Sequence, residues 1–476
     1  MTTTRDEPES LLLVLHGARG DLAARMVLPS MYLLYRRALL PDEWRIIGTG
    51  RAEMTDDEFI DHVHDALEKY SDEPLDSGWH DFAARLAYTT EVTEDAPWEQ
   101  EQAIGDQTNK GALLVHYLAV PPSAFAPITR ALAKHDLLTD ARVVYEKPFG
   151  TSPESFTELD ALVHEHLDEE QVFRIDHFLA KEGTQNLHVL RFANELFAHS
   201  WNREHVAEVQ IDVPETLDVA QRAEFYDATG ASLDMLVTHL FQVASEVALE
   251  TPDSLDVDAL VAAREEVFRS FRELEPTDDV VLGQFTGYTD IDGVDDDSTT
   301  DTYVAARLWI DNERWQDVPF VLRTGKMLAG AAQRVTLVLR APRGPMAGES
   351  TVRPNAISVS ISGDGEIELS TTVKRPGPEL ELASGIARLS LDDVDPGASL
   401  PPYASAIHDV LDGDRRAFTT SATLTEAWRA FAPLLGPGRP APEPYEPGSW
   451  GPTAADRLVG DEGWWVRGDG DTPHGD

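Results

Sequence analysis

The chain contains no cysteine among its 476 residues. Disulfide bonds, thiolate metal centres and cysteine nucleophiles are therefore excluded. Long apolar runs are also missing, so no segment is expected to span a membrane. The stretch Met1–Ser10 is polar and carries acidic residues, unlike a signal peptide. These absences together predict a cytoplasmic protein without disulfides.

Cationic residues are scarce as well. Lysines and arginines number 39 against 85 aspartates and glutamates, for a formal net charge of −46. So acidic a surface argues against nucleic acid as a partner, and it suggests adaptation either to salt or within a strongly acidic proteome. An acidic protein that binds anions must concentrate its few cations locally, so a cluster of lysine, arginine or histidine is more informative here than usual. Hydrophobic residues make up 42%, which predicts a globular protein of two or three domains.

The first apolar run leads directly into a glycine turn. Leu11–Leu15 is typical of a buried parallel strand, and His16-Gly17-Ala18-Arg19-Gly20-Asp21 follows it. From Leu22 onward the apolar residues approximate a helical period. Strand, glycine turn and helix in this order point backbone N–H groups at a pyrophosphate. The glycine spacing lacks the full dinucleotide fingerprint, so an ordinary tight turn is the alternative.

A second predicted strand, Trp44–Gly48, ends just before Arg51. An arginine at this point of a doubly wound fold accommodates the 2′-phosphate of NADP, whereas an acid favours NAD. Arg51 therefore favours NADP, with a surface loop arginine as the alternative.

Two further strands, 113–120 and 143–145, are expected in the same domain. Lys147 follows the second of them, at the strand end where open α/β sheets bind their ligands. The bond between Lys147 and Pro148 is a candidate for the cis form. Residues 1–175 are thus predicted to form a Rossmann-type dinucleotide-binding domain.

The densest group of ionisable residues is the stretch Arg174–Glu182. A helical period is expected from Phe178 onward, which would place His177 and Lys181 on one helix face. Two cations on one face favour an anion between them, and phosphate suits this role. Asp176 is placed either to cap the helix or to orient a histidine elsewhere. The alternative is a capped helix with a solvated basic edge.

The remainder, 176–476, is predicted to be an α+β domain with a large, mainly antiparallel sheet. The alternation in 206–213 indicates a strand of a half-exposed sheet. The helical stripe 233–247 carries Asp234 and His239, and each also suits a structural role. Strand patterns dominate beyond Pro276, with 323–326 expected as a turn between strands.

Together these segments resemble the glucose-6-phosphate dehydrogenase family over nearly the whole chain. The matching segments are Gly17–Ala23, Gly48–Arg51, Tyr117–Pro122, Glu146–Gly150, Phe173–Glu182, Leu190–Asn194, Asp234–Met235 with His239, Arg323–Lys326 and Gly448–Pro452. The segment around Asp176 is the most specific of them.

The resemblance implies oxidation of the C1 hydroxyl of glucose 6-phosphate to 6-phosphogluconolactone, as in the pentose phosphate pathway. The hydride would pass to NADP, with NAD possible, and no metal would take part. The substrate would be a sugar phosphate, and the second domain would form a homodimer or homotetramer through its sheet.

The resemblance also implies roles for individual residues. His239 would be the general base, and Asp176 would set its tautomer and stabilise the imidazolium. Substrate would be held by His177 and Lys181 at the phosphate, and by Glu215, Asp234 and Lys326 at the sugar hydroxyls. Lys147 would lie between sugar and cofactor. The cofactor would be held by Gly17, Ala18, Arg19, Gly20, Asp21 and Leu22 at the pyrophosphate, and by Arg51 at the 2′-phosphate.

Four positions depart from the family pattern: Arg19 replaces a threonine, Met26 a lysine, Phe178 a tyrosine and Ala331 a lysine. The last three losses are expected to weaken phosphate binding, by roughly 1.5–3 kcal/mol for each lost charged contact. Two alternatives therefore stay open. One is a dehydrogenase of free glucose or another hexose phosphate. The other is a catalytically weak relative that binds NADP or a sugar phosphate.

Overall fold

The computed structural model of the chain describes residues 8–95, 111–254, 256–343, 353–362, 365–395, 397 and 399–466. The chain divides into two compact units. The first unit is 1–180 with 400–421, and the second is 181–399 with 422–476. The boundary predicted after residue 175 lies close to this division, but the prediction assigned 400–421 to the second domain.

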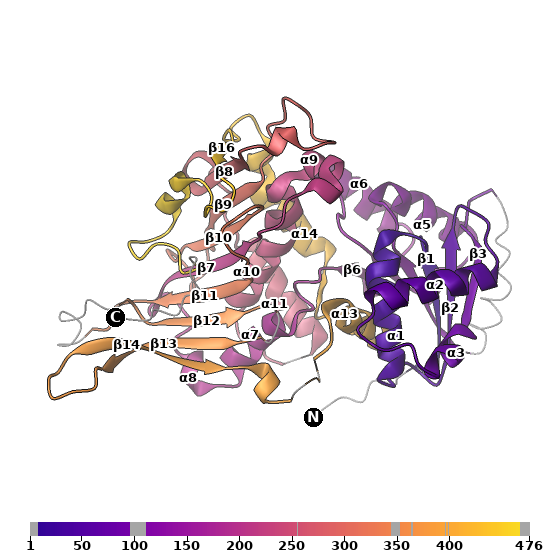
Figure 1. Cartoon of the computed structure of the whole chain (residues 1–476), viewed down its shortest axis with the longest axis horizontal. Coiled ribbons are helices and arrows are strands. Elements are labelled where there is room, and N and C mark those ends of the chain that lie inside the picture. Colours follow the sequence, from indigo (N-terminus) through magenta and orange to yellow (C-terminus); the bar gives the residue numbers. More distant parts are fainter. Residues whose placement is uncertain are drawn as a thin grey trace. The chain divides into compact units, whose positions relative to one another are not determined.

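The described part of the first unit is built on a seven-stranded sheet of order β15-β6-β5-β4-β1-β2-β3 (Figure 1). Strands β1 to β6 run parallel, and β15 is antiparallel to β6. The strand order reverses between β1 and β4, as in dinucleotide-binding folds, so the predicted Rossmann-type arrangement is confirmed. The strands are β1 (Ser10–His16), β2 (Glu43–Gly50), β3 (Leu86–Thr90), β4 (Leu113–Leu118), β5 (Arg142–Tyr145), β6 (Val172–Ile175) and β15 (Phe418–Thr419).

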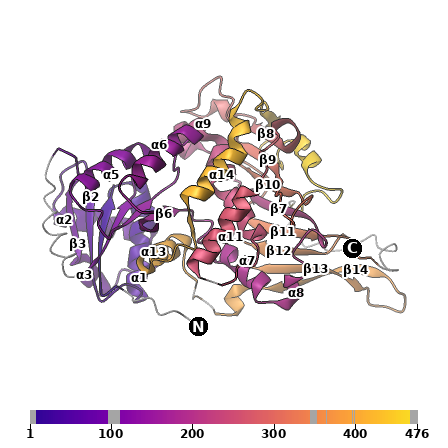
Figure 2. The same ribbon diagram turned by 180° about the vertical axis from the view of Figure 1, so that it is seen from behind.

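Helices cover both faces of this sheet (Figures 1 and 2). Because both faces are covered, the apolar side chains of Leu11–Leu15 in β1 are all buried. Helix α2 starts with a capping box, in which Thr55 Oγ1 accepts from Glu58 N and the Glu58 carboxylate accepts from Thr55 N. The helices are η1 (Ala23–Val27), α1 (Leu28–Arg36), α2 (Asp56–Tyr70), α3 (Gly78–Ala83), η2 (Pro122–Ala124), α5 (Phe125–Lys134), α6 (Pro153–His164), η3 (Glu169–Gln171) and α13 (Pro402–Asp412).

The segment 400–421 joins the first unit through its apolar side chains. Ala404, Ile407 and Leu411 of α13 belong to the same buried cluster as β1. Phe418 of β15 packs edge-on against Phe173 of β6, with ring centroids 5.0 Å apart. Burial of this apolar face draws in a segment that is remote in sequence.

The described part of the second unit contains a nine-stranded sheet of order β14-β13-β12-β11-β7-β10-β9-β8-β16. Only the pairs β7 with β10 and β8 with β16 run parallel among these strands, which confirms a mainly antiparallel sheet. The strands are β7 (Val206–Pro214), β8 (Val280–Phe285), β9 (Tyr303–Leu308), β10 (Phe320–Gly325), β11 (Arg334–Leu339), β12 (Ala356–Ser360), β13 (Ile367–Lys374), β14 (Leu382–Leu389) and β16 (Glu443–Tyr445).

Helices α7, α11 and α14 lie on one face of this sheet (Figure 2). The helical stripe predicted at 233–247 is confirmed: it forms a π-helical segment, η5, that continues into α10. The helices are α7 (Glu182–Phe192), α8 (Glu195–Ala198), η4 (Ala220–Arg222), α9 (Ala223–Ala231), η5 (Ser232–Leu240), α10 (Phe241–Ala248), α11 (Val257–Arg269), α12 (Pro276–Asp279), η6 (Tyr288–Asp290), η8 (Leu391–Asp393), α14 (Ser421–Phe431), η9 (Ala432–Leu435) and η10 (Thr453–Leu458).

Two predictions for this sheet were wrong. Strand β7 is not half-exposed, because it lies inside the sheet and the C-terminal segment covers its polar side chains. Glu208 accepts from Gly460 N, and Gln210 accepts from Trp465 N. Arg323 does not lie in a turn but in β10, where it is buried and pairs with Asp212 of β7 at 2.6 Å.

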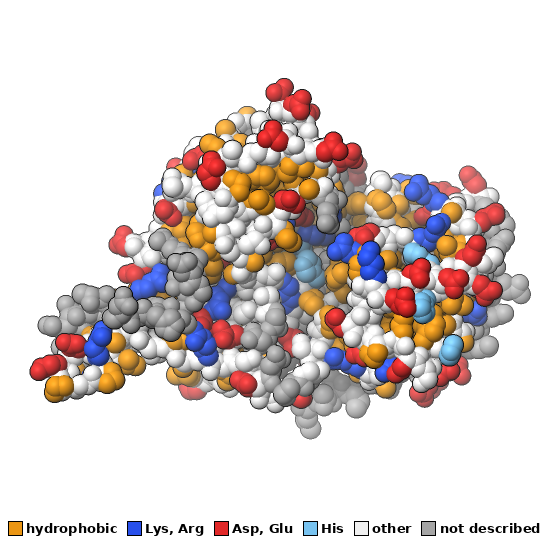
Figure 3. All heavy atoms as spheres, in the orientation of Figure 1, with side chains coloured by type: hydrophobic (Ala, Val, Ile, Leu, Met, Phe, Trp, Pro, Cys, Tyr) orange, Lys and Arg blue, Asp and Glu red, His pale blue; other side chains and the backbone are white. Residues whose placement is uncertain are grey.

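Surface and helix composition complete the fold. Aspartate and glutamate side chains are spread over the visible surface of both units (Figure 3). Among the described residues, no helix combines the length and the apolar character that crossing a membrane requires.

Candidate active site

The glycine turn of the first unit is built for close approach of the backbone. Gly17 has φ +76°, and a Cβ there would lie 2.5 Å from the carbonyl oxygen of Ala119. Gly17 N and Ala18 N both donate to Thr49 O at 3.0 Å, which ties the turn to the end of β2. Only glycine is accommodated at position 17, so the turn packs its backbone directly against the end of β4.

The side chains of the turn differ in exposure. Ala18 is buried and Leu22 half-buried, whereas Arg19 and Asp21 are exposed. Asp21 pairs with Arg25 at 3.5 Å. The Arg19 guanidinium adds to the effect of burial and lowers the pKa of His62 on α2. The charge of Arg19 therefore acts on α2.

Arg51 is exposed just beyond the end of β2. Burial raises the pKa of Glu91, which follows β3, and the Arg51 guanidinium opposes that shift. At neighbouring Gly50, a Cβ would lie 2.6 Å from the Tyr88 hydroxyl, so the backbone and an aromatic side chain meet here. An exposed arginine at this strand end is suited to bind a 2′-phosphate.

The end of β5 carries a buried carboxyl group beside Lys147. The Lys147–Pro148 bond is cis, which confirms the conformation considered from the sequence. Glu146 is 6% exposed, and burial raises its pKa to about 7. Tyr117 of β4 donates to Glu146 Oε1 at 2.5 Å. A carboxyl group with such a pKa changes its charge near neutrality.

Asp176 and His177 lie in a turn that follows β6. The expected helix from Phe178 onward begins only at Glu182, so His177 and Lys181 do not share a helix face. Asp176 instead caps the turn, because its Oδ1 accepts from Phe178 N at 2.8 Å. The ring of His177 lies against Phe178 and Tyr403, with centroids 4.8 and 6.2 Å away.

In the second unit, His239 and Asp234 lie on η5. His239 is 1% exposed, and Asp234 lies in the first turn, where the helix dipole favours an acid. A π-helical segment often marks a functional site, because it shifts side chains from the regular helical positions.

Glu215 and Lys326 form an ion pair at the ends of two neighbouring strands. Lys326 Nζ lies 2.6 Å from Glu215 Oε2. Lys326 also lies over the ring of Tyr226, at 5.7 Å from the centroid. Burial raises the pKa of Tyr226 well above its ordinary value, and the charges of Asp234 and Glu215 add to the shift. Glu215, Asp234 and Lys326 therefore surround one tyrosine of α9.

Lys181 is nearly buried and donates to Gln333 Oε1. Gln333 lies two residues beyond Ala331, the position where the resemblance predicts a lysine. Phe178 is 2% exposed and Met26 37% exposed, so the first departure is buried in the core and the second reaches solvent.

The sequence did not predict five polar residues that lie beside these side chains: Tyr117, Glu146, Tyr226, Gln333 and Tyr403. Glu146 had a usable signal, since it directly precedes Lys147 at a predicted strand end. Tyr403 and Gln333 had none, because their contacts join segments that are distant along the chain.

Comparison with known proteins decides the family. Two protein-family models match the chain. The model described as "Glucose-6-phosphate dehydrogenase, NAD binding domain" matches residues 14–186, and the model described as "Glucose-6-phosphate dehydrogenase, C-terminal domain" matches residues 188–466. The chain belongs to the glucose-6-phosphate dehydrogenase family. Asp176, His177 and Lys181 lie in the first family domain, and Glu215, Asp234, His239 and Lys326 lie in the second.

Relatives and solved structures in this family match along almost their full length. Glucose-6-phosphate 1-dehydrogenase 1 of Mycobacterium tuberculosis is 36% identical over 465 residues, covering 95% of this chain and 96% of that protein. The crystal structure of the Mycobacterium avium enzyme matches with a TM-score of 0.86 at 36% identity, covering 97% and 99% of the two chains. A glucose-6-phosphate dehydrogenase in complex with glucose 6-phosphate matches with a TM-score of 0.90 at 28% identity, covering 98% and 100%.

Proposed function

We propose that this chain is a glucose-6-phosphate 1-dehydrogenase that oxidises the C1 hydroxyl of glucose 6-phosphate and transfers hydride to NADP. The observation that carries the proposal is the match to both family domains, over 14–186 and 188–466, at 36% identity to a curated enzyme. The product would be 6-phosphogluconolactone.

The residues of the first unit fit a dinucleotide. The glycine turn follows β1, at the strand end where dinucleotide-binding folds hold a pyrophosphate, and Arg51 is exposed to meet a 2′-phosphate. NADP, when bound, supplies the carbon that accepts the hydride. Arg51 supports NADP over NAD, since a guanidinium pairs with a phosphate through two hydrogen bonds.

His239 would take the proton of the C1 hydroxyl as the hydride leaves C1. An imidazole is suited to this step because its ordinary pKa lies near neutrality. The carboxylate of Asp176 would hold the other ring nitrogen and stabilise the imidazolium that forms.

The remaining residues would hold the substrate. His177 and Lys181 would bind the sugar phosphate, with Lys147 between sugar and cofactor. Glu215, Asp234 and Lys326 would bind the sugar hydroxyls, a role supported by their common place around Tyr226. Gln333, which already contacts Lys181, could supply an amide donor that offsets the missing lysine at position 331.

A second candidate is a dehydrogenase with relaxed specificity for free glucose or another hexose phosphate. It is favoured by Phe178, which is buried and has no hydroxyl to offer a phosphate. A weakly catalytic NADP-binding or sugar-phosphate-binding relative is the third candidate. The presence of both His239 and Asp176 speaks against it, because such a protein needs no base.

Initial rates separate these candidates. Reduced nicotinamide would be followed with glucose 6-phosphate or glucose, each with NADP or NAD, at low and high salt. A strong preference for glucose 6-phosphate with NADP supports the proposal. Equal rates with glucose would favour the second candidate, and nucleotide binding without turnover would favour the third.

We also propose a homodimer or homotetramer located in the cytoplasm. The absence of cysteine is compatible with a reducing compartment. Light scattering of the purified protein would measure the oligomeric state, and cell fractionation would test the location.

A further inference from the structure

The buried carboxyl of Glu146 connects two tyrosines of the first unit. Tyr117 of β4 donates to Oε1 at 2.5 Å, and the Tyr403 hydroxyl of α13 lies 3.4 Å from Oε2. Burial, together with the charge of Glu146, raises the pKa of Tyr117 well above its ordinary value, so Tyr117 stays protonated and donates. One oxygen of Glu146 is thus held firmly, and the other faces Tyr403.

Tyr403 links this carboxyl to the turn after β6. Its ring lies nearly parallel to the imidazole of His177, with an angle of 17° and centroids 6.2 Å apart. Phe178 bounds the same imidazole at 4.8 Å. The imidazole therefore has two aromatic rings beside it, and of these only Tyr403 carries a hydroxyl that can be anchored.

We propose that Glu146 and Tyr403 are positioning residues that orient His177 for the phosphate of the substrate. This inference rests on the proposed function, in which His177 binds that phosphate. A tyrosine ring anchored at its hydroxyl presents a fixed face to the imidazole, which restricts the side-chain angles of His177. Less rotational freedom is then lost when the phosphate binds.

The positioning of His177 by Glu146 and Tyr403 is expected to depend on pH, because it depends on the protonation state of Glu146. The titratable groups that face its carboxyl are Tyr117 from β4, Tyr403 from α13 and Lys147 beyond β5. Burial raises the pKa of Glu146 to about 7, against the combined effect of these three neighbours. As pH falls through 7, the carboxyl gains a proton and becomes a poorer acceptor for Tyr403. The affinity for the sugar phosphate should fall with it.

The test uses the full-length chain with Tyr403→Phe and Glu146→Gln, each alone and combined with His177→Gln. Tyr403→Phe keeps the ring and removes the hydroxyl that contacts Glu146, so it remains informative if Glu146→Gln impairs folding. Tyr35→Phe is the matched control, because Tyr35 is also a half-buried helical tyrosine and donates one bond, of 3.3 Å, to Gly78 O. Thermal unfolding of each variant would report its folding.

We expect both single variants to raise KM for glucose 6-phosphate about two- to tenfold, as for loss of one hydrogen bond of ordinary net strength, with kcat nearly unchanged. In the His177→Gln background the same changes should have little further effect, because neighbouring residues that act through one group are non-additive. KM for free glucose, which has no phosphate, should be unchanged. Glu146→Gln should also flatten the dependence of KM on pH around neutrality.

Two results would overturn the inference, and they differ in what they say of the proposed function. If His177→Gln raises KM for glucose 6-phosphate but Tyr403→Phe and Glu146→Gln leave it unchanged or act additively, only the positioning role is wrong. If His177→Gln itself leaves KM unchanged, the assigned phosphate site and the positioning role are both wrong.

Discussion

Lys326 Nζ and Glu215 Oε2 lie 2.6 Å apart at the ends of β10 and β7, two strands that run parallel. The pair presents a cation and an anion side by side, and sugar hydroxyls can donate to one and accept from the other. The short distance also means that neither charge is left without a partner when no sugar is present.

Removal of this cation should weaken substrate binding. Lys326→Ala is expected to raise KM for glucose 6-phosphate about tenfold to a hundredfold, because a charged hydrogen bond is lost. Steady-state kinetics measure the effect. Arg375→Ala is the control, since Arg375 also pairs with a glutamate, Glu381 at 3.6 Å, but is exposed on the surface. Equal effects of the two changes would argue against a specific role for Lys326.

Replacement of the proposed base should strongly lower turnover without unfolding the protein. His239→Asn is expected to lower kcat by about 10²–10⁴, the usual contribution of a general base, with a small change in KM. Circular dichroism would report folding, and His199→Asn serves as control because His199 is 81% exposed in the same unit. Unaltered turnover of a folded His239 variant would contradict the mechanism.

Arg51 should decide the choice of cofactor. Arg51→Ala is expected to raise KM for NADP about tenfold or more, since a charge-assisted phosphate contact is lost, while KM for NAD changes little. Arg45→Ala, another exposed arginine of the β2 region, is the comparison. A parallel rise in both KM values would show that Arg51 acts on the fold rather than on the 2′-phosphate.

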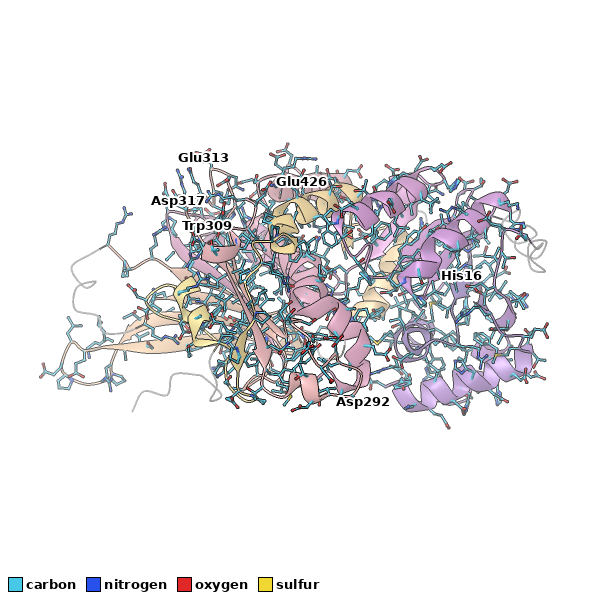
Figure 4. The ribbon with its side chains drawn as sticks, turned by 90° about the horizontal axis from the view of Figure 1, so that it is seen from above. His16, Asp292, Trp309, Glu313, Asp317 and Glu426 are labelled. Atoms are coloured by element: carbon cyan, nitrogen blue, oxygen red, sulfur yellow. The ribbon has the colours of Figure 1, made fainter. Side chains whose placement is uncertain are left out.

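A buried pair of histidines should make the protein sensitive to acid. His16 Nε2 lies 3.2 Å from His116 Nδ1 inside the first unit, where Figure 4 labels His16. Burial lowers the pKa of His116 to about 4 and that of His16 well below its ordinary value, with His116 adding to the second shift. Unfolded histidines take up protons near pH 6.5, so the unfolded state gains protons first as pH falls.

The free energy of unfolding should therefore decrease as pH falls from about 6.5 toward 4, by up to about 1.4 kcal/mol per pH unit for each histidine. Urea midpoints measured across this range would give the slope. Replacing both residues with leucine should make the slope shallower, whatever its effect on stability at neutral pH. His199→Leu, which removes an exposed histidine, should leave the slope unchanged.

Local patterns in the sequence were enough to predict several of the elements. The apolar run Leu11–Leu15, the turn at Gly17 and the stripe 233–247 each specify their structure through neighbours close in the chain. The helix expected at Phe178 was wrong because a separate turn comes first, in which the Asp176 side chain accepts from Phe178 N and the Asp176 carbonyl oxygen accepts from Leu179 N.

Tertiary structure alone decided which distant groups meet. The sequence determined that Glu208, Gln210 and Asp212 occupy alternate positions of one strand. Their burial depends on distant residues: the C-terminal segment contacts Glu208 and Gln210, and Arg323 pairs with Asp212. In the same way, α13 brings Tyr403 to Glu146, and Gln333 meets Lys181. Such contacts depend on how apolar faces pack across long separations, and the periodicity of one segment carries no information about its partner.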